Sequence, residues 1–306
     1  MAGSVGTLCL LLILLLVFAC LSNLFFTPNN ITNLLVQSGT NAIIAIGMTF
    51  VIISGNIDIS VGSTLALAGC IGAKIMVTTG NTLLGIIVTL GTGIILGMIN
   101  GVMVSYLGFQ PFIVTLATMW LYRGCAYLFT EGRAIVGLPE TLVTLGRGQL
   151  LFLPNVIWLI AVLYIICWFV LQKSTFGRHI CAIGDNQESA RLSGINVKKT
   201  KLMVFCMSGF FAALSGLVYM SRLNSGQPIA GQSYEMYAIA AAVIGGASLV
   251  KGGIGNIVGT LIGAIFIAGL QNGLTILNVS TYWQQVCMGL VVLLAVGLDR
   301  LRKSVT

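Results

Sequence analysis

The stretch from Leu83 to Ser105 reads LLGIIVTLGTGIILGMINGVMVS and contains no charged residue. About 20 residues of α-helix, each rising ~1.5 Å, cross the ~30 Å hydrocarbon core of a bilayer, so this stretch is predicted to span a membrane. Similar apolar runs recur along the chain, at about residues 7–25, 32–54, 61–78, 83–105, 111–130, 156–172, 202–220, 237–250, 254–272 and 282–299. The sequence therefore predicts an all-α polytopic membrane protein with about ten transmembrane helices.

The composition agrees with this fold class. Hydrophobic residues make up 57% of the 306 residues and charged residues 7%, whereas about 25% of the residues of a soluble domain are charged. Residues 1–306 are therefore expected to form a single transmembrane domain with no soluble domain. No Lys or Arg precedes the first apolar run, contrary to the usual pattern of a secretory signal peptide, so this run is expected to be retained as a span.

The net charge of +8 fits the positive-inside rule, by which cytoplasmic loops of membrane proteins carry the excess Lys and Arg. With both termini in the cytoplasm, ten of the fifteen Lys and Arg residues fall on the cytoplasmic side, and the opposite orientation leaves only four there. Both termini are therefore predicted to be cytoplasmic. The basic residues do not form a face interleaved with aromatic residues, so no nucleic-acid partner is expected.

The largest polar segment is the loop at 173–201, which reads KSTFGRHICAIGDNQESARLSGINVKKTK and carries six of the basic residues. The predicted orientation places this loop in the cytosol. Asp185, followed three positions later by Glu188, is a variant of the capping box that begins a helix. Gly194 fits the left-handed stop just past a helix end. The pattern predicts a short helix from Asn186 to Ser193, outside the membrane.

Two interpretations of this loop are open. Exposed groups on and beside the short helix, at Gly184, Gln187 and Arg191, would suit the docking of a partner protein. Alternatively, the loop is a solvated segment whose charge fixes the topology of the chain. The pattern of residues is compatible with both.

Ionisable residues inside a membrane are functional candidates because an intramembrane charge is costly. Asp58 lies in the stretch GNIDISVGS, at the reversal between the second and third predicted spans. Either Asp58 or Ser60 caps the helix that begins near Val61, or Asp58 lies on a translocation path, and the two roles are compatible. The polar residues that could line such a path are Asn41, Thr49, Asn56, Asp58 and Ser60. Interhelical hydrogen bonds are the alternative use for each of the uncharged ones.

Arg123 lies within the fifth predicted span, about seven residues from its outer end. Seven residues of helix rise ~10 Å. A long side chain can reach that far with its charged end, so the guanidinium is expected to snorkel to the membrane interface.

The chain shows no arrangement typical of catalysis. It has no G-x-x-x-x-G-K-[ST] phosphate loop, no H-E-x-x-H motif and no nucleophile elbow. None of the eight cysteines forms a C-x-x-C pair and His179 is the single histidine, so no metal site is expected. If ATP drives this protein, ATP and Mg²⁺ are bound by a partner.

Short motifs follow one another along nearly the full chain. They are FFTPNN at 25–30, NAI at 41–43, GMT at 47–49, GNIDISVGS at 55–63, TFGR at 175–178, AIGDN at 182–186, ARLSGI at 190–195, QP at 227–228, YE at 234–235, GGAS at 245–248 and GTLIG at 259–263. With these motifs the chain resembles the permease subunits of bacterial ABC importers for monosaccharides, the family that contains the ribose permease. The order of several motifs makes the resemblance specific.

The resemblance implies a bacterial inner-membrane importer with two permease subunits, a cytosolic ABC ATPase that binds ATP and Mg²⁺, and a periplasmic or extracellular sugar-binding protein. The second permease subunit is either an identical chain or a paralogue. In this family a cytosolic loop acts as the coupling helix that seats on the ATPase, and by position it is the loop at 173–201. The coupling residues would be Gly184, Asp185, Glu188, Arg191 and Gly194.

The resemblance therefore implies ATP-driven import of a pentose, a hexose or a related small polyol. One departure from the family is Asn56, where a glycine is usual, and it leaves a role of Asp58 beyond capping open. The alternatives are a secondary transporter driven by an ion gradient, with Asp58 as its ion site, and a membrane scaffold that transports nothing.

Overall fold

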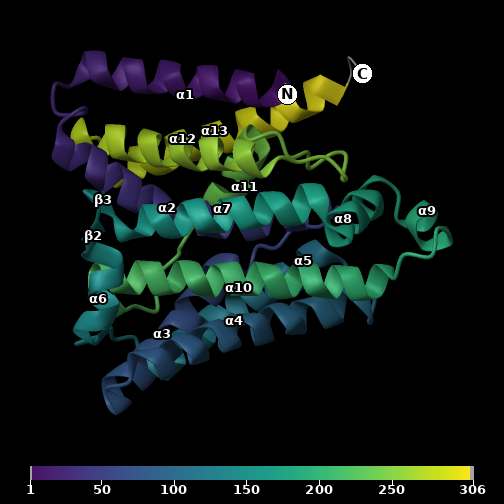
Figure 1. Cartoon of the computed structure of the whole chain (residues 1–306), viewed down its shortest axis with the longest axis horizontal. Coiled ribbons are helices and arrows are strands. Elements are labelled where there is room, and N and C mark those ends of the chain that lie inside the picture. The colour runs from purple at the N-terminus through teal and green to yellow at the C-terminus, as the bar shows by residue number, and fades with distance from the viewer. Residues whose placement is uncertain (1, 304–306) are drawn as a thin grey trace.

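The apolar runs form helices in the computed structural model, which describes residues 2–303 of the chain (Figure 1). The elements in these residues are α1 (Ala2–Leu21), α2 (Pro28–Ile53), α3 (Val61–Thr79), α4 (Thr82–Ser105), α5 (Pro111–Thr130), β1 (Ile135–Val136), α6 (Glu140–Arg147), β2 (Gln149–Leu150), β3 (Leu153–Pro154), α7 (Asn155–Lys173), α8 (Thr175–Asp185), α9 (Gln187–Leu192), α10 (Val197–Leu223), β4 (Ser225–Gly226), α11 (Tyr234–Ile244), α12 (Ile257–Ile276) and α13 (Thr281–Lys303). The predicted all-α polytopic membrane fold is confirmed.

Each of the ten predicted spans overlaps a helix. In the described chain, seven helices are long and apolar enough to cross a membrane: α2, α3, α4, α5, α7, α10 and α12. Three further apolar helical stretches are shorter, at Gly6–Leu21, Tyr234–Ile244 and Thr281–Gly297. The count of ten crossings stays a prediction.

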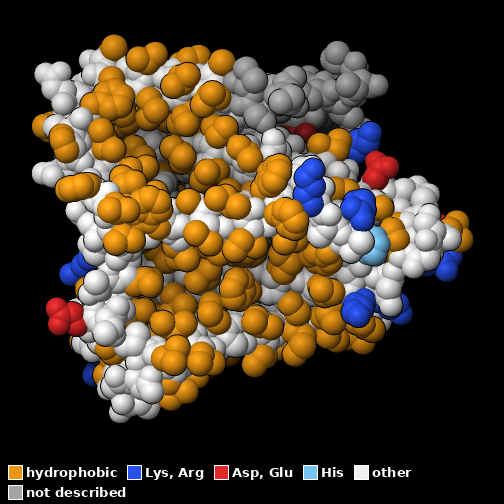
Figure 2. All heavy atoms as spheres, in the orientation of Figure 1, with side chains coloured by type: hydrophobic (Ala, Val, Ile, Leu, Met, Phe, Trp, Pro, Cys, Tyr) orange, Lys and Arg blue, Asp and Glu red, His pale blue; other side chains and the backbone are white. Residues whose placement is uncertain are grey.

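The two ends of the helical bundle differ in character. The strand pairs β1–β4 and β2–β3 lie with α6 at one end, and α8 and α9 project at the other, toward which α1 begins and α13 ends (Figure 1). Figure 2 shows hydrophobic side chains over the long helices and several Lys and Arg side chains near α8 and α9. The side chains of Arg300, Arg302 and Lys303, which the charge count places in the cytoplasm, lie outside the described ones.

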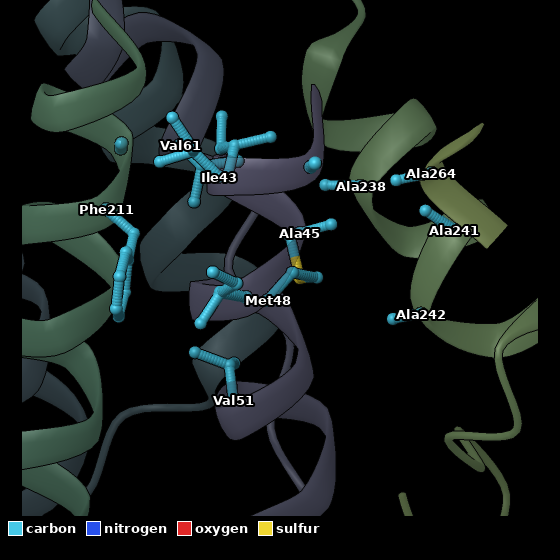
Figure 3. Packing of buried hydrophobic residues seen from close by; sticks show 14 of the residues in the cluster. Ile43, Ala45, Met48, Val51, Val61, Phe211, Ala238, Ala241, Ala242 and Ala264 are labelled. Atoms are coloured by element: carbon cyan, nitrogen blue, oxygen red, sulfur yellow. The ribbon is translucent and has the colours of Figure 1, made fainter. Parts of the chain in front are cut away.

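Helix α2 forms the centre of the bundle. Every residue from Ser38 to Ile53 is buried, because α10, α12, α11 and α7 all pack against this helix. Figure 3 shows Met48 of α2 between Phe211 of α10 and the alanines Ala238 and Ala241 of α11. Small residues let membrane helices approach closely, which replaces the hydrophobic drive that water provides in soluble proteins.

Glycines bring α4 and α10 into backbone contact. A Cβ atom built at Gly93 would collide with the carbonyl oxygen of Gly209, and one built at Gly97 would collide with that of Phe205. The close contact fixes the rotation of α10. Ser208 of α10 is thereby turned toward the reversal between α2 and α3, where it is fully enclosed.

Helix α11 is too short to cross the membrane by itself. The 11 residues of α11 make about 16 Å of helix, half of the hydrocarbon core. The segment before it, 225–233, is not helical and runs along α3: Gly226 lies against Ala73, and Gly231 lies against Gly62, about three turns away. The predicted span at 237–250 is therefore wrong in its bounds.

The glycine pair that follows Ile244 explains this difference. Gly245 is the C-cap of α11 and Gly246 has a φ of +99°, a left-handed conformation that ends the helix. The chain thus leaves the helix six residues before the predicted end of the span.

Candidate functional site

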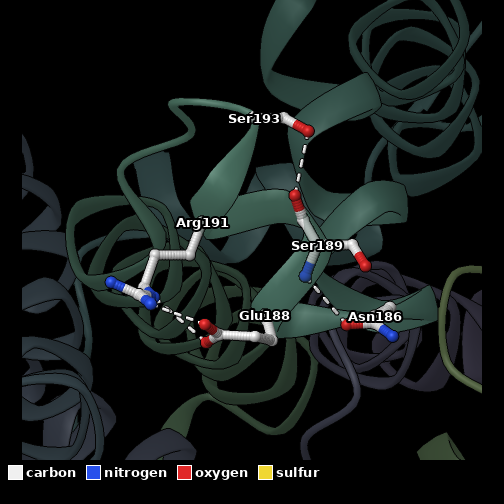
Figure 4. Close-up of polar contacts among 5 residues, drawn as sticks. All are labelled: Asn186, Glu188, Ser189, Arg191 and Ser193. Atoms are coloured by element: carbon white, nitrogen blue, oxygen red, sulfur yellow. Dashed lines mark hydrogen bonds and ion pairs between the residues drawn. The ribbon is translucent and has the colours of Figure 1, made fainter.

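The loop at 173–201 folds into α8 and α9, which project beyond the long helices (Figure 1). Each helix begins with a side-chain cap. Ser174 Oγ accepts a hydrogen bond from Gly177 N at 3.1 Å, and Asn186 Oδ1 accepts one from Ser189 N at 2.9 Å (Figure 4). These caps satisfy amide groups that have no partner in the first turn of a helix.

The start of α9 differs from the predicted capping box. Asp185 is the last residue of α8, so the cap falls to Asn186, and α9 begins at Gln187 and ends at Leu192. A helix at 175–185, which the sequence analysis did not predict, is the reason for the shift. The predicted stop is present: Gly194 has a φ of +83°.

Glu188 and Arg191 form an ion pair on the exposed face of α9. The guanidinium donates to the carboxylate through bonds of 3.0 Å and 2.5 Å (Figure 4). This hydrogen bonding holds the pKa of the Glu188 carboxyl below its usual value and raises the pKa of Arg191. Both side chains are 64% exposed, so the pair adds little to stability. Its charges, and the neighbouring Leu192, which is 75% exposed, are available to a partner.

A small apolar core holds α9 to the rest of the chain. Ile183 of α8, Ala190 of α9 and Val197 of α10 are buried against one another. On the side of α10, Lys201 Nζ donates a hydrogen bond to Gln187 Oε1 at 2.7 Å. These contacts join α9 to α8 and to the start of α10.

The end of α8 touches the transmembrane helices at Gly184. A Cβ atom built there would collide with Ile53 O and Gly253 N, and these two atoms share a hydrogen bond of 2.8 Å. Three backbones, from the end of α8, the end of α2 and the loop between α11 and α12, meet where only glycine fits. The expectation that Gly184 is exposed for docking is wrong, because this residue faces inward and is partly buried.

The loop between α11 and α12 is also bound to α13. Asp299 Oδ2 accepts hydrogen bonds from Ser248 Oγ at 3.1 Å and from Leu249 N at 3.0 Å. Gly252 of the same loop packs on the backbone of Gly184. The contact at Gly184 thus links α8 to α2, to the loop before α12, and through that loop to α13.

Asp58 joins the reversal between α2 and α3 to three other helices. Its Oδ1 accepts hydrogen bonds from Ser60 N at 3.0 Å and Ser60 Oγ at 2.6 Å, and its Oδ2 accepts one from Ser208 Oγ of α10 at 2.7 Å. Asn100 Nδ2 of α4 donates to Ser60 Oγ at 2.8 Å, and Tyr122 OH of α5 lies 3.2 Å from Asn100 Oδ1. All five residues are buried.

The local part of this network is a turn just before α3. Helix α3 begins at Val61, as predicted, and Ser60 makes no side-chain cap of its own. Asp58 accepts from the amide of Ser60, the residue before the helix, rather than from an amide of the first turn. Its role in translocation stays a prediction.

The other predicted path residues lie within the helix packing. Thr49 Oγ1 shares a hydrogen bond of 2.8 Å with Thr260 Oγ1 of α12. Asn56 Nδ2 donates to Ser54 Oγ at 2.7 Å and borders a cavity of about 180 Å³. The buried side-chain amide of Asn41 has no hydrogen-bond partner among the described residues. The structure does not bring these residues to one site, and their place on a path stays a prediction.

Arg123 lies in surroundings that the sequence analysis missed. Its guanidinium does not snorkel: Nη1 donates to Pro228 O and to Ala230 O, each at 2.6 Å. These carbonyl groups belong to the non-helical segment before α11. A cavity of about 370 Å³ lies beside the guanidinium, and Glu235 also lines it. Pro228 was the residue in the sequence that could have indicated this non-helical segment, because proline lacks an amide N–H and cannot continue a helix.

Comparison with known proteins identifies the kind of molecule that carries these features. The model of the family described as the permease component of branched-chain amino acid transport systems matches residues 30–296. The chain belongs to this permease family. Ribose import permease protein RbsC of Haemophilus influenzae is 45% identical over 293 residues, which cover 94% of this chain and 90% of the relative.

Other relatives agree with this membership. Ribose import permease protein RbsC of Bacillus subtilis is 44% identical over 296 residues, 96% of this permease and 92% of the relative. D-allose transport system permease protein AlsC of Escherichia coli is 39% identical over 298 residues, with coverages of 97% and 91%. No solved structure matches the permease. The resemblance drawn from the motifs is confirmed, the permease is a multi-pass inner-membrane protein, and no relative supports the secondary transporter.

Proposed function

We propose that the chain is the membrane permease of an ATP-driven importer for a monosaccharide or a related small polyol. The observation that carries the proposal is the 45% identity with a ribose import permease over 94% of the chain. Relatives named for D-allose, xylose and L-arabinose transport each match at least 92% of the chain. A partner ATPase binds ATP and Mg²⁺, a separate sugar-binding protein delivers the substrate, and a second permease subunit completes the membrane part.

In this proposal the chain crosses the membrane ten times, with both termini and α9 in the cytoplasm. The ATPase docks on the exposed face of α9 around Glu188, Arg191 and Leu192. Nucleotide binding can shift the permease between two conformations only if the ATPase prefers one of them. The backbone contact at Gly184 supports this route, since it connects α8 directly to the end of α2 and to the reversal that holds Asp58.

Glu188→Ala and Arg191→Ala are expected to lower ATP-driven uptake in proteoliposomes that contain the permease, its ATPase and its binding protein. Truncating an important interface side chain costs about 2 kcal/mol or more, so uptake per permease should fall at least about tenfold. The fold should persist, because an exposed ion pair adds little to stability. Uptake of D-ribose, D-allose, D-xylose and L-arabinose is measured together with ATP hydrolysis.

The control for this pair is Glu140→Ala, an exposed carboxylate in the first turn of α6 at the opposite end of the bundle, which should leave uptake unchanged. Wild-type rates in both α9 variants would reject the docking role. Wild-type uptake that ignores ATP but follows a proton or sodium gradient would reject the ATP-driven importer itself.

The side of the membrane that α9 occupies can be tested by thiol labelling of spheroplasts. In a variant without the eight native cysteines, Ser193→Cys should react with an impermeant maleimide only after permeabilisation. Arg133→Cys, in the exposed loop after α5, should react in intact spheroplasts. Labelling of Ser193→Cys in intact spheroplasts would contradict the proposed orientation.

Native Cys181 of α8 should react more slowly than Ser193→Cys after permeabilisation. Burial raises the pKa of the Cys181 thiol, so less of the reactive thiolate is present at neutral pH. The labelling rate of a variant that keeps only Cys181 should therefore continue to rise with pH beyond the range in which the labelling rate of Ser193→Cys levels off. Equal pH profiles for the two thiols would contradict this expectation.

A further inference from the structure

We propose that the cavity beside Arg123 binds a neutral polyhydroxylated ligand, and that it is the permease's own monosaccharide site within the translocation path. This inference rests on the proposed function and says where in the permease the substrate binds. The cavity of about 370 Å³ is lined by Trp120, Arg123, Tyr127, Gln232, Ser233 and Glu235, among others. Its volume lies within the range of roughly 300–1,000 Å³ that is typical of small-molecule sites.

The cavity lies well inside the predicted span of α5. Arg123 is about 18 Å along the helix from Pro111 and about 10 Å from Thr130. The opposite wall is the non-helical segment before α11. Its carbonyl groups at Pro228 and Ala230 accept hydrogen bonds from the guanidinium of Arg123. Non-helical backbone at membrane depth is tolerated only where protein buries it or where it lines a water-filled cavity. The fold therefore places an interrupted helix and a charged side chain at one point of the membrane interior.

The charged side chains around the cavity, Arg123 and Glu235, do not suit contact with lipid. Trp120 is 71% exposed and Tyr127 41%, and Arg123 and Glu235 beside them are also partly exposed. Charged side chains within a membrane face the bundle interior or a water-filled cavity, because lipid cannot solvate them. The exposed face around the cavity is therefore the wall of an aqueous path in the assembled transporter.

The lining selects a neutral ligand rich in hydroxyl groups. Arg123 and Glu235 are a basic and an acidic side chain that line the same cavity, yet no direct ion pair joins them in the described chain. A charged ligand would match one of the two and repel the other. Vicinal hydroxyls both donate and accept, so one sugar can bind the guanidinium Nε and Nη2, which have no hydrogen bond within the described residues, and the carboxylate as well. Trp120 and Tyr127 supply aromatic faces for its C–H surface.

The site is also mechanically close to the reversal between α2 and α3. Glu235 Oε2 lies 2.7 Å from the place where a Cβ atom of Gly62 would be. Gly62 follows Asp58 by four residues, at the start of α3. A movement that reaches the reversal through Gly184 and Ile53 would therefore change the position of the carboxylate that holds the ligand.

The test uses the full-length permease in lipid nanodiscs and the fluorescence of Trp120. Trp158, Trp168 and Trp283 are replaced by Phe, which leaves Trp120 as the only tryptophan of the four in the chain. The probe is whichever of D-ribose, D-allose, D-xylose or L-arabinose the assembled wild-type importer takes up. Its titration through the millimolar range should change the emission of Trp120 saturably.

Glu235→Gln should raise the midpoint of this titration at least about tenfold, as expected when a hydrogen bond to a charged group is lost, and Gln232→Ala should raise it by a smaller factor. Glu235→Gln keeps the shape of the side chain, so its fold should be unchanged. Glu140→Gln, outside the cavity, should leave the midpoint unchanged. If the importer transports a sugar to which Trp120 does not respond, or if Glu235→Gln and Gln232→Ala keep the wild-type midpoint, this site is wrong while the proposed function stands. Wild-type uptake that does not depend on ATP would overturn the proposed function itself.

Discussion

Gly184→Ala is expected to reduce sugar uptake and to destabilise the contact between α8 and the transmembrane helices. The added methyl group would collide with Ile53 O and Gly253 N, both of them backbone atoms. Either α8 moves away, or the 2.8 Å hydrogen bond between Gly253 and Ile53 breaks. Overpacking of this kind costs about 1–3 kcal/mol, and every ~1.4 kcal/mol shifts an equilibrium tenfold. Uptake per permease should therefore fall by about fivefold to a hundredfold.

The measurement is ATP-driven uptake and ATP hydrolysis in proteoliposomes, with the thermal stability of the purified permease as a second readout. The expected result is hydrolysis that continues while uptake falls. Gly91→Ala of α4 is the matched control, because a Cβ atom at this helical glycine meets no atom within 4 Å. Wild-type uptake and stability in Gly184→Ala would show that α8 does not transmit motion through this contact.

Asp58→Ala is expected to cause the largest loss of stability. The substitution leaves the amide of Ser60 and the hydroxyl of Ser208 buried without their acceptor. Each buried donor without a partner costs about 1–3 kcal/mol, so the loss should be about 2–6 kcal/mol. The reversal, α4, α5 and α10 are linked through this carboxylate, so uptake should fall with stability. The melting temperature in detergent and the yield of monodisperse permease measure the effect.

Asp58→Asn separates the hydrogen bonds from the charge. The amide oxygen can still accept from Ser60, and the hydroxyl of Ser208 can rotate to accept from the new amide N–H. This variant should keep most of the stability and of the uptake. A stable Asp58→Asn permease without uptake would instead show that the negative charge takes part in transport, as the ion-site alternative requires.

The spans were predictable because lipid imposes a direct rule on sequence. A helix in hydrocarbon needs about 20 consecutive apolar residues, and the breaks between helices carry residues that end them. Pro111 begins α5 and Gly80, with a φ of +67°, follows α3, so the bounds of these helices were predicted to within one residue. The rule failed at α11, which follows a non-helical segment where Gly231 and Ser233 take left-handed conformations.

The details of the loop at 173–201 depend on contacts that its own residues do not reveal. Gly177 and Gly184 are typical of turns, yet both lie in α8, where neighbouring backbones leave no room for a side chain. Once α8 extends to Asp185, the cap of α9 must be Asn186. The sequence pattern predicted the cap at Asp185, and the tertiary packing that extends α8 moves it to Asn186.

The surroundings of Arg123 show a different limit of prediction from sequence. Its partners are carbonyl groups of Pro228 and Ala230, more than a hundred residues away in the chain. Every residue has a carbonyl group, so no side-chain pattern marks these two as acceptors. The buried links from Asn100 to Ser60 and Tyr122 were easier to anticipate, because interhelical hydrogen bonds are the common use of an amide within a membrane.

The short helix α11 also bears on the order in which the chain can be built into the membrane. A helix of 11 residues is too short to be inserted as a complete span by its own hydrophobicity. The segment 225–244 is held by Gly62 of α3, against which Gly231 lies, and by α12, where Gly263 packs on Ala241. Its packing on α12 can therefore form only after α12 has left the ribosome. A nascent chain that stops before Ile257 should present this segment to the proteases that clear unfinished membrane proteins.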